Sequence, residues 1–222
     1  MDAALANTLT RVGQAFLPYP RRAVLDGCPH CRPTTLVDEH DLFSLTMRLG
    51  TTVGSRTDVK SLLPLLLERL VTSRELDPYI VLSKLAQEQW RTWPSVEQQA
   101  IEEYLATVWR ALLAQFPSQT GAFVDAADFL AAVDATGDGV DPFLATWDTV
   151  LGPAADRHLA LLVNSYIYAD RRHKVTATWL YRKAIRNRLL TAFERDHDAA
   201  WADDLAMAYD ILCLHLATEQ PD

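Results

Sequence analysis

The sequence VEQQAIEEYLATVWRALLAQF, at residues 96–116, contains the clearest helical pattern in the chain. Its apolar side chains recur at the i, i+3, i+4 and i+7 spacing of one helical face: Ile101, Tyr104, Leu105, Val108, Leu112 and Phe116. Trp109 and Leu113 make this face wider than one packing partner requires. We therefore expect a central core helix, contacted by helices from both halves of the sequence.

The rest of the chain shows further helical patterns separated by proline, glycine and capping residues. Asp77 followed by Pro78 is typical of a helix start. Among the later helices we expect one at residues 176–195 and the last at residues 198–216. No run alternates apolar and polar residues, so no sheet is expected. The predicted fold is all-α, an irregular orthogonal bundle of about nine helices, with short α-solenoid-like stacking as the alternative.

Length and composition indicate an ordinary folded protein. The 222 residues can bury a sizeable core, and 49% hydrophobic with 23% charged residues is close to the globular average. One domain is expected, with any subdomain break at residues 117–124, where most of the turn-forming sequence FPSQTG lies. No stretch approaches the roughly 20 apolar residues of a membrane span, so no membrane association is expected.

The net charge indicates which kind of partner the protein could bind, and the cysteines indicate the cellular compartment. A net charge of -8 disfavours non-specific binding to nucleic acid and favours a basic protein partner. The first residues lack the basic and apolar regions of a signal peptide. Only three cysteines are present, two of them in a Cys-x-x-Cys, which suits a reducing compartment better than a disulfide framework. We expect a cytoplasmic protein.

The sharpest local motif is Cys-Pro-His-Cys at residues 28–31. Two thiolates at this spacing can bind zinc, and His40 is the nearest further ligand to Cys28 and Cys31. The same pair can cycle between dithiol and disulfide, and the tetrapeptide resembles the active site of thioredoxin-fold thiol oxidases. That fold needs a strand before the motif and a helix after it, which the sequence does not predict. Zinc binding, redox activity and a purely structural role all stay open.

A second motif is the basic segment at residues 166–195, with eight Lys or Arg against two acidic residues. Trp179, Arg182 and Arg186 share one face of the expected helix, as residues that stack on single-stranded bases would. The residues that follow carry acids without any basic residue: Asp196, Asp198, Asp203, Asp204 and Asp210. We expect ion pairs between these two segments, and nucleic-acid binding is the less favoured alternative.

Catalytic motifs do not stand out in the sequence. Neither G-x-S-x-G nor H-E-x-x-H nor a glycine-rich phosphate loop occurs. We therefore expect a protein that is not an enzyme.

Four segments together resemble a family of uncharacterised bacterial all-helical proteins. They are VLDGCPHCRP (24–33), TDVKSLLPLLLERLV (57–71), DPYIVLSKLAQEQWRTWP (77–94) and EEYLATVWRALL (102–113). The resemblance implies a bacterial cytosolic protein and provides no activity to transfer. The predicted function is a helical protein-interaction module, an acidic immunity-type or neutralising partner of a basic protein. The alternative is a small metalloprotein or thiol-redox protein that uses Cys28 and Cys31.

Overall fold

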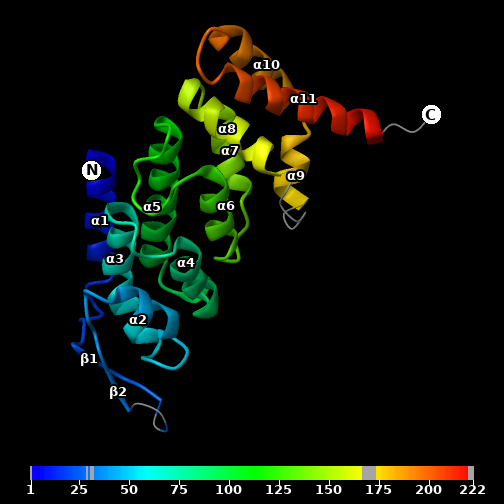
Figure 1. Cartoon of the computed structure of the whole chain (residues 1–222). Helices are drawn as coiled ribbons and strands as arrows, with labels where there is room; N and C mark the ends of the chain where they lie inside the picture. The colour runs from blue at the N-terminus through cyan, green and yellow to red at the C-terminus, as the bar shows by residue number, and fades with distance from the viewer. Residues whose placement is uncertain (1, 29, 31–32, 167–173, 220–222) are drawn as a thin grey trace. The chain divides into compact units, whose positions relative to one another are not determined.

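A computed structural model describes residues 2–28, 30, 33–166 and 174–219, with the backbone alone at residues 166 and 215–219. The chain is mostly helical, which confirms the all-α class (Figure 1). The prediction of about nine helices was too low, because the described residues form eleven α-helices and one 3-10 helix. No helix in this part of the chain is both long and apolar enough to cross a membrane.

The elements follow in this order: α1 (Ala3–Ala15), β1 (Val24–Asp26), β2 (Thr34–Leu36), α2 (Leu42–Arg48), α3 (Arg56–Thr72), α4 (Pro78–Gln87), η1 (Trp90–Thr92), α5 (Ser95–Ala114), α6 (Ala126–Asp134), α7 (Asp141–Thr149), α8 (Pro153–Tyr166), α9 (Lys174–Leu180), α10 (Lys183–Asp196) and α11 (Ala202–Glu219). Asp77 caps α4, as predicted, by accepting hydrogen bonds from the first main-chain N–H groups of that helix.

The expectation that the chain contains no sheet was wrong. β1 and β2 form an antiparallel hairpin in which Leu25 lies opposite Thr35. These two residues are buried, whereas Val24 and Leu36 form an exposed pair on the other face. Each strand is three residues long, so the alternation is too short to stand out in the sequence.

The chain divides into two compact units. Unit 1 comprises Met1–Ala111, Ser118–Val124 and Asp128–Gly139. Unit 2 comprises Leu112–Pro117, Asp125–Ala127 and Val140–Asp222. The single-domain organisation therefore stays a prediction.

The core of unit 1 is built on α3 and α5. The predicted apolar face is buried from Ile101 to Leu113, and Tyr104 and Trp109 are fully enclosed. α5 ends at Ala114, before the predicted end, so Phe116 lies outside the helix and is only partly buried. The Tyr104 hydroxyl donates to the carbonyl oxygen of Leu67 on α3 at 2.8 Å. Trp109 stacks on Phe129 of α6 with a centroid distance of 4.7 Å. The apolar face of α5 is thus wide enough to contact both α3, which precedes it in the sequence, and α6, which follows it, as expected.

A buried ion pair also joins α3 to α5. Lys60 Nζ lies 2.6 Å from Glu97 Oε2, and both side chains are less than a tenth exposed. The Tyr19 hydroxyl donates to the other Glu97 oxygen at 2.7 Å and accepts from Lys60 at 3.1 Å. The Trp93 ring covers the ammonium group at 4.4 Å. Because each polar group has a partner, burial of this pair carries no unsatisfied charge.

Unit 2 is organised around α8, α10 and α11, which pack against one another (Figure 1). The helix predicted at residues 176–195 is two helices, because Arg182 between α9 and α10 has extended backbone angles. The last helix begins at Ala202, later than the predicted residue 198.

Gly121 is the glycine with the strictest steric demand. Its φ is +53°, and a Cβ atom there would lie 2.3 Å from the Leu70 carbonyl oxygen at the end of α3. The next residue, Ala122, donates its N–H to that same oxygen at 2.8 Å. A side chain at residue 121 would therefore force this loop away from α3.

We predict that Gly121→Ala destabilises unit 1 by at least about 1–3 kcal/mol, the cost of the left-handed backbone alone. The control is Gly13→Ala in α1, where nothing lies within 4 Å of the added methyl group. That change removes a mid-helix glycine and should stabilise the protein by up to about 1 kcal/mol. Urea unfolding of both variants measures the two effects, and equal shifts would contradict the structure.

Candidate functional site

The residues predicted to bind zinc are only partly described. Cys28 is half-buried in the loop after β1, and His40 is exposed in the turn before α2. Cys31 lies outside the described residues. In the described part of the chain, no three His, Cys, Asp or Glu side chains are grouped closely enough to hold a metal ion. The zinc and thiol-redox alternatives therefore stay predictions.

Trp179, Arg182 and Arg186 do not lie on one helix. Trp179 is in α9, Arg182 precedes α10, and Arg186 is in α10. The Trp179 ring is buried and stacks on Trp147 of α7 at 5.3 Å, and its indole N–H donates to Asp148 at 3.0 Å. The structure thus places the predicted base-stacking residue inside a helix interface.

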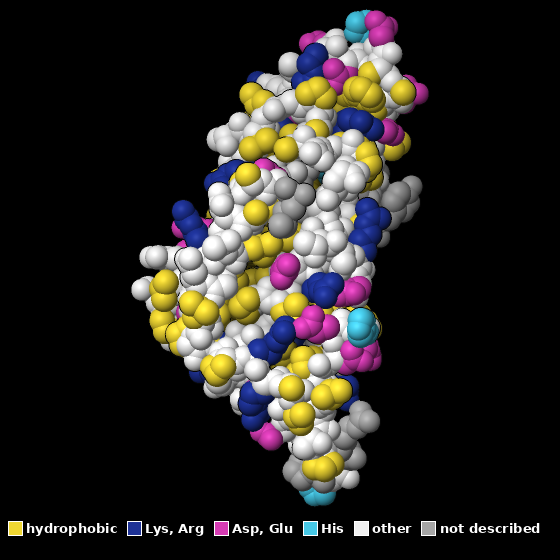
Figure 2. Space-filling view, turned by 90° about the vertical axis from the view of Figure 1, so that its left-hand side faces the viewer, with side chains coloured by type: hydrophobic (Ala, Val, Ile, Leu, Met, Phe, Trp, Pro, Cys, Tyr) yellow, Lys and Arg dark blue, Asp and Glu magenta, His cyan; other side chains and the backbone are white. Residues whose placement is uncertain are grey.

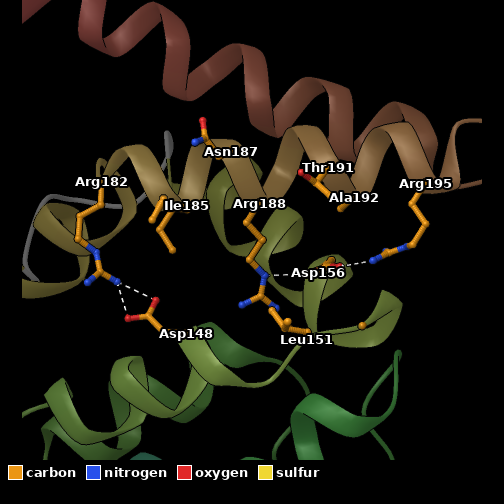
Figure 3. Close-up of a pocket in the computed structure, with 12 residues that line it drawn as sticks. Asp148, Leu151, Asp156, Arg182, Ile185, Asn187, Arg188, Thr191, Ala192 and Arg195 are labelled. Carbon is orange, nitrogen blue, oxygen red and sulfur yellow. Dashed lines mark hydrogen bonds and ion pairs between the residues drawn. The ribbon is translucent and has the colours of Figure 1, made fainter.

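The arginines of the basic segment bind carboxylates on α7 and α8. Figure 3 shows Arg182, Arg188 and Arg195 extending from α10 and the residue before it toward these helices. Arg182 Nη2 donates to both oxygens of Asp148, at 2.7 and 2.6 Å. Arg188 Nε and Arg195 Nη1 donate to the two oxygens of Asp156, at 2.7 and 2.9 Å. Only Asp156 and Arg188 are largely buried, with side-chain exposures of 4% and 11%.

Arg188 also donates hydrogen bonds to the end of α7. Its two terminal nitrogens donate to the carbonyl oxygens of Trp147 and Val150, at 2.6 and 2.7 Å. These carbonyls belong to the last turn of α7, where no intrahelical donor is available. One guanidinium group therefore fixes the end of α7, the start of α8 and the middle of α10.

Two grooves flank the Asp148–Arg182 pair in unit 2. One has a volume of about 600 Å³ and runs along α10, where Leu151, Ile185 and Thr191 line it beside the three arginines (Figure 3). The other has a volume of about 530 Å³ and lies against α9, with Val175 in its wall. The guanidinium groups in the first groove already have carboxylate partners. The grooves are therefore lined by apolar side chains and by ion pairs, and their arginines are not free to bind an anion.

Among the described residues, the predicted ion pairs between the basic segment and the acids that follow it are limited to Arg195 with Asp196. Of the five aspartates expected as partners, Asp196 binds Arg195, the residue before it, and Asp198 lies beside His197. Asp203, Asp204 and Asp210 have no salt bridge to any described residue. Arg188 and Arg195 of α10 bind groups on α7 and α8 instead.

These acids lie on an exposed face of α11. Asp203, Met207, Asp210 and Leu214 are spaced at i, i+4, i+7 and i+11, and all four are exposed. Met207 is 49% and Leu214 is 68% exposed, although both are apolar. We call these four residues the α11 stripe. Their spacing is evident in the sequence, although exposed residues of a helix carry no periodic signal as clear as its apolar face.

On the face shown in Figure 2, Lys and Arg side chains lie next to Asp and Glu side chains, with hydrophobic side chains scattered between them. Such neighbours neutralise one another and contribute little to attraction at a distance. Asp203 and Asp210 have no salt bridge to a described residue, so this face of α11 is suited to attract a cation.

The surroundings of the buried His158 on α8 alter its titration. Its Nε2 lies 2.9 Å from the carbonyl oxygen of Gln115, whereas Nδ1 is buried without a hydrogen-bond partner among the described residues. Its ring packs edge-on against Phe116. Burial lowers the pKa of His158 below 6.5, against the opposing effects of the Gln115 and Leu112 carbonyls and Asp125.

Comparisons with known proteins identified no relative. No family model, no curated protein and no solved structure matches the chain. The functional argument therefore rests on the residues themselves, and the family resemblance of residues 24–113 stays a prediction.

We predict that Asp156→Asn destabilises unit 2 by about 3–5 kcal/mol, because it leaves the buried Arg188 without a negative partner. The matched control is Asp148→Asn, which neutralises an exposed pair and can still accept the Trp179 hydrogen bond; it should cost no more than about 1 kcal/mol. Amide hydrogen exchange along α8 and α10 measures both changes. A smaller effect at residue 156 than at residue 148 would contradict this ranking.

We also predict that acidification destabilises the protein through His158. Because the folded-state pKa is lowered, the unfolded state binds more protons as the pH falls through about 6.5, and the free energy of unfolding decreases by up to about 1.4 kcal/mol per pH unit. His158→Gln should show a smaller drop in melting temperature between about pH 7.5 and about pH 5.5 than the wild type. The exposed control His197→Gln should match the wild type, and the reverse order would refute the assignment to His158.

Proposed function

We propose that this chain is a protein-interaction module whose α11 stripe binds a basic, amphipathic helix of a partner protein. The observation that carries the proposal is the exposed stripe itself, in which Asp203 and Asp210 alternate with Met207 and Leu214. The acids provide electrostatic attraction and the apolar side chains provide area to bury.

The packing of α11 explains why this face is available. Leu205, Ala208 and Leu212 are buried on the side of α11 that packs against α8 and α10. The stripe residues lie outside that face. Residues 197–222 contain no Lys or Arg, so this segment provides no cation of its own. Exposed methionine and leucine between acids suit a partner that brings its own apolar side chains.

The chemistry of the partner follows from the stripe. A helix that places apolar residues at i, i+3 or i+4 and i+7 matches Met207 and Leu214, and lysine or arginine at its flanks matches the two aspartates. The net charge of -8 adds long-range attraction for such a partner. One concrete version is a neutralising partner of a basic toxin or nucleic-acid-binding protein in a reducing compartment.

The test uses a synthetic amphipathic helix with leucines at that spacing and lysines at both flanks. Its binding to the full chain is measured by fluorescence anisotropy at about 50 mM and about 300 mM salt, where screening differs strongly. We predict salt-sensitive binding that Asp203→Asn with Asp210→Asn weakens about fivefold at low salt, since two exposed pairs contribute about 0.5 kcal/mol each. Met207→Gln with Leu214→Gln should remove it.

The control for net charge is Asp2→Asn with Glu68→Gln on unit 1. Both residues are exposed, and asparagine retains the hydrogen bond by which Asp2 caps α1. This control should leave the affinity unchanged. An equal loss in the control, or no binding by the wild type, would show that the stripe is not the site.

A further inference from the structure

The hydrogen-bond pattern of the β1–β2 hairpin shows which main-chain groups point outward. Two bonds close the hairpin at its ends, Gly27 N–H to Pro33 C=O and Val37 N–H to Ala23 C=O, each 2.9 Å long. Three residue pairs lie between these bonds. Bonded and non-bonded pairs alternate in an antiparallel ladder, so the central pair is bonded and the pairs on both sides of it are not.

The outer edge of β2 is therefore open. Leu25 and Thr35 are the bonded pair, and the N–H and C=O groups of Thr34 and Leu36 point away from β1. Neither residue makes a main-chain hydrogen bond to any described residue. The corresponding edge of β1 is partly used, because the Asp26 carbonyl oxygen accepts from the Gly54 N–H at 2.7 Å. Of the two described strands, β2 is the one with unpaired outward groups on two alternate residues beside a cavity.

That cavity has a volume of about 410 Å³ and lies between β2 and α2. Asp38 and Asp41 line it, together with Leu45 and Arg48 of α2. The two carboxylates accept only main-chain hydrogen bonds, from His40 at 2.9 Å and Ser44 at 3.2 Å, and no described Lys or Arg pairs with them.

Thr35 adds an independent observation. Its side chain lines the cavity, is 5% exposed, and its hydroxyl has no hydrogen-bond partner among the described residues. A buried hydroxyl without a partner costs free energy, and a polar group that enters the cavity would relieve this cost.

We propose that the open edge of β2 binds an extended peptide segment as a third antiparallel strand. Thr34 and Leu36 each exchange two main-chain hydrogen bonds with the segment. The residue of the segment opposite Thr35 has its side chain on the same face as Thr35 and enters the cavity, where the two aspartates select a basic group. Its neighbours lie on the opposite face, beside the exposed pair Val24 and Leu36, and are apolar. The recognised pattern is apolar–basic–apolar.

The probe is a capped, fluorescein-labelled peptide of alternating valine and lysine, measured by anisotropy against the full chain. Leu36→Pro removes the outward N–H without removing any bond of the hairpin and should weaken binding at least about tenfold. Leu36→Val keeps the N–H and should bind as the wild type does. Asp38→Asn with Asp41→Asn keeps both main-chain hydrogen bonds while removing the charges, and it should weaken binding in low salt only.

Two modified peptides test the main-chain bonds on the wild-type protein, in case Leu36→Pro perturbs the hairpin. Methylation of the main-chain nitrogens of the valine residues removes the N–H groups that face β2 and should abolish binding. Methylation of the main-chain nitrogens of the lysine residues affects N–H groups that face solvent and should leave binding in place. Equal behaviour of the two peptides, or no binding of the unmodified one, overturns the proposal.

Sedimentation measurements separate this occupant from a second copy of the chain. A dimer that dissociates in Leu36→Pro and resists the peptide would show that the edge pairs with itself, which also overturns the proposal. The site lies in unit 1 and uses no residue of α11. Variants of the α11 stripe should therefore leave peptide binding unchanged, whatever the outcome for that stripe.

Discussion

The carboxylate of Asp156 determines the direction in which two arginines of α10, Arg188 and Arg195, extend. It is almost fully buried at the start of α8 and accepts hydrogen bonds from Arg188 and Arg195. Arg188 in turn holds the last carbonyls of α7. A buried carboxylate that lost these partners would be strongly destabilising, so this arrangement is constrained far more tightly than a surface pair. Arg188 and Arg195 are thereby held at α7 and α8, and among the described residues no salt bridge reaches Asp203, Asp204 or Asp210 of α11.

Sequence periodicity predicted the helical class and the central helix well, and the cap at Asp77 followed from residue type alone. The hairpin was missed because three residues per strand give no measurable period. The break between α9 and α10 was missed for a different reason. Residues 176–195 have continuous helical spacing, and Arg182 departs from it where its side chain binds Asp148, a contact 34 residues away in sequence. Tertiary contacts overrule local preference in such places.

The sequence was sufficient to predict which charged residues occur in the candidate site, but not which residues they bind. The excess of basic residues and the following acids were both evident in the sequence, and their proximity suggested pairing. Which helix an arginine faces depends on the packing of buried side chains such as Ile185 and Leu189, and that cannot be deduced from charge order. By contrast, the buried face of α11 follows the helical spacing of Leu205, Ala208 and Leu212, and the exposed stripe is the complement of that face.

The two proposed surfaces use different physical interactions, and this difference makes them separable. The α11 stripe depends on exposed carboxylates whose field is screened within about 10 Å at 0.1 M salt, so its affinity should fall steadily as salt is added. The edge of β2 depends mainly on main-chain hydrogen bonds, which direct the partner's backbone and tolerate many side chains. Added salt removes only the contribution of Asp38 and Asp41 there. Ionic strength therefore distinguishes helix docking on α11 from strand addition on β2, even for a partner that is basic in both segments.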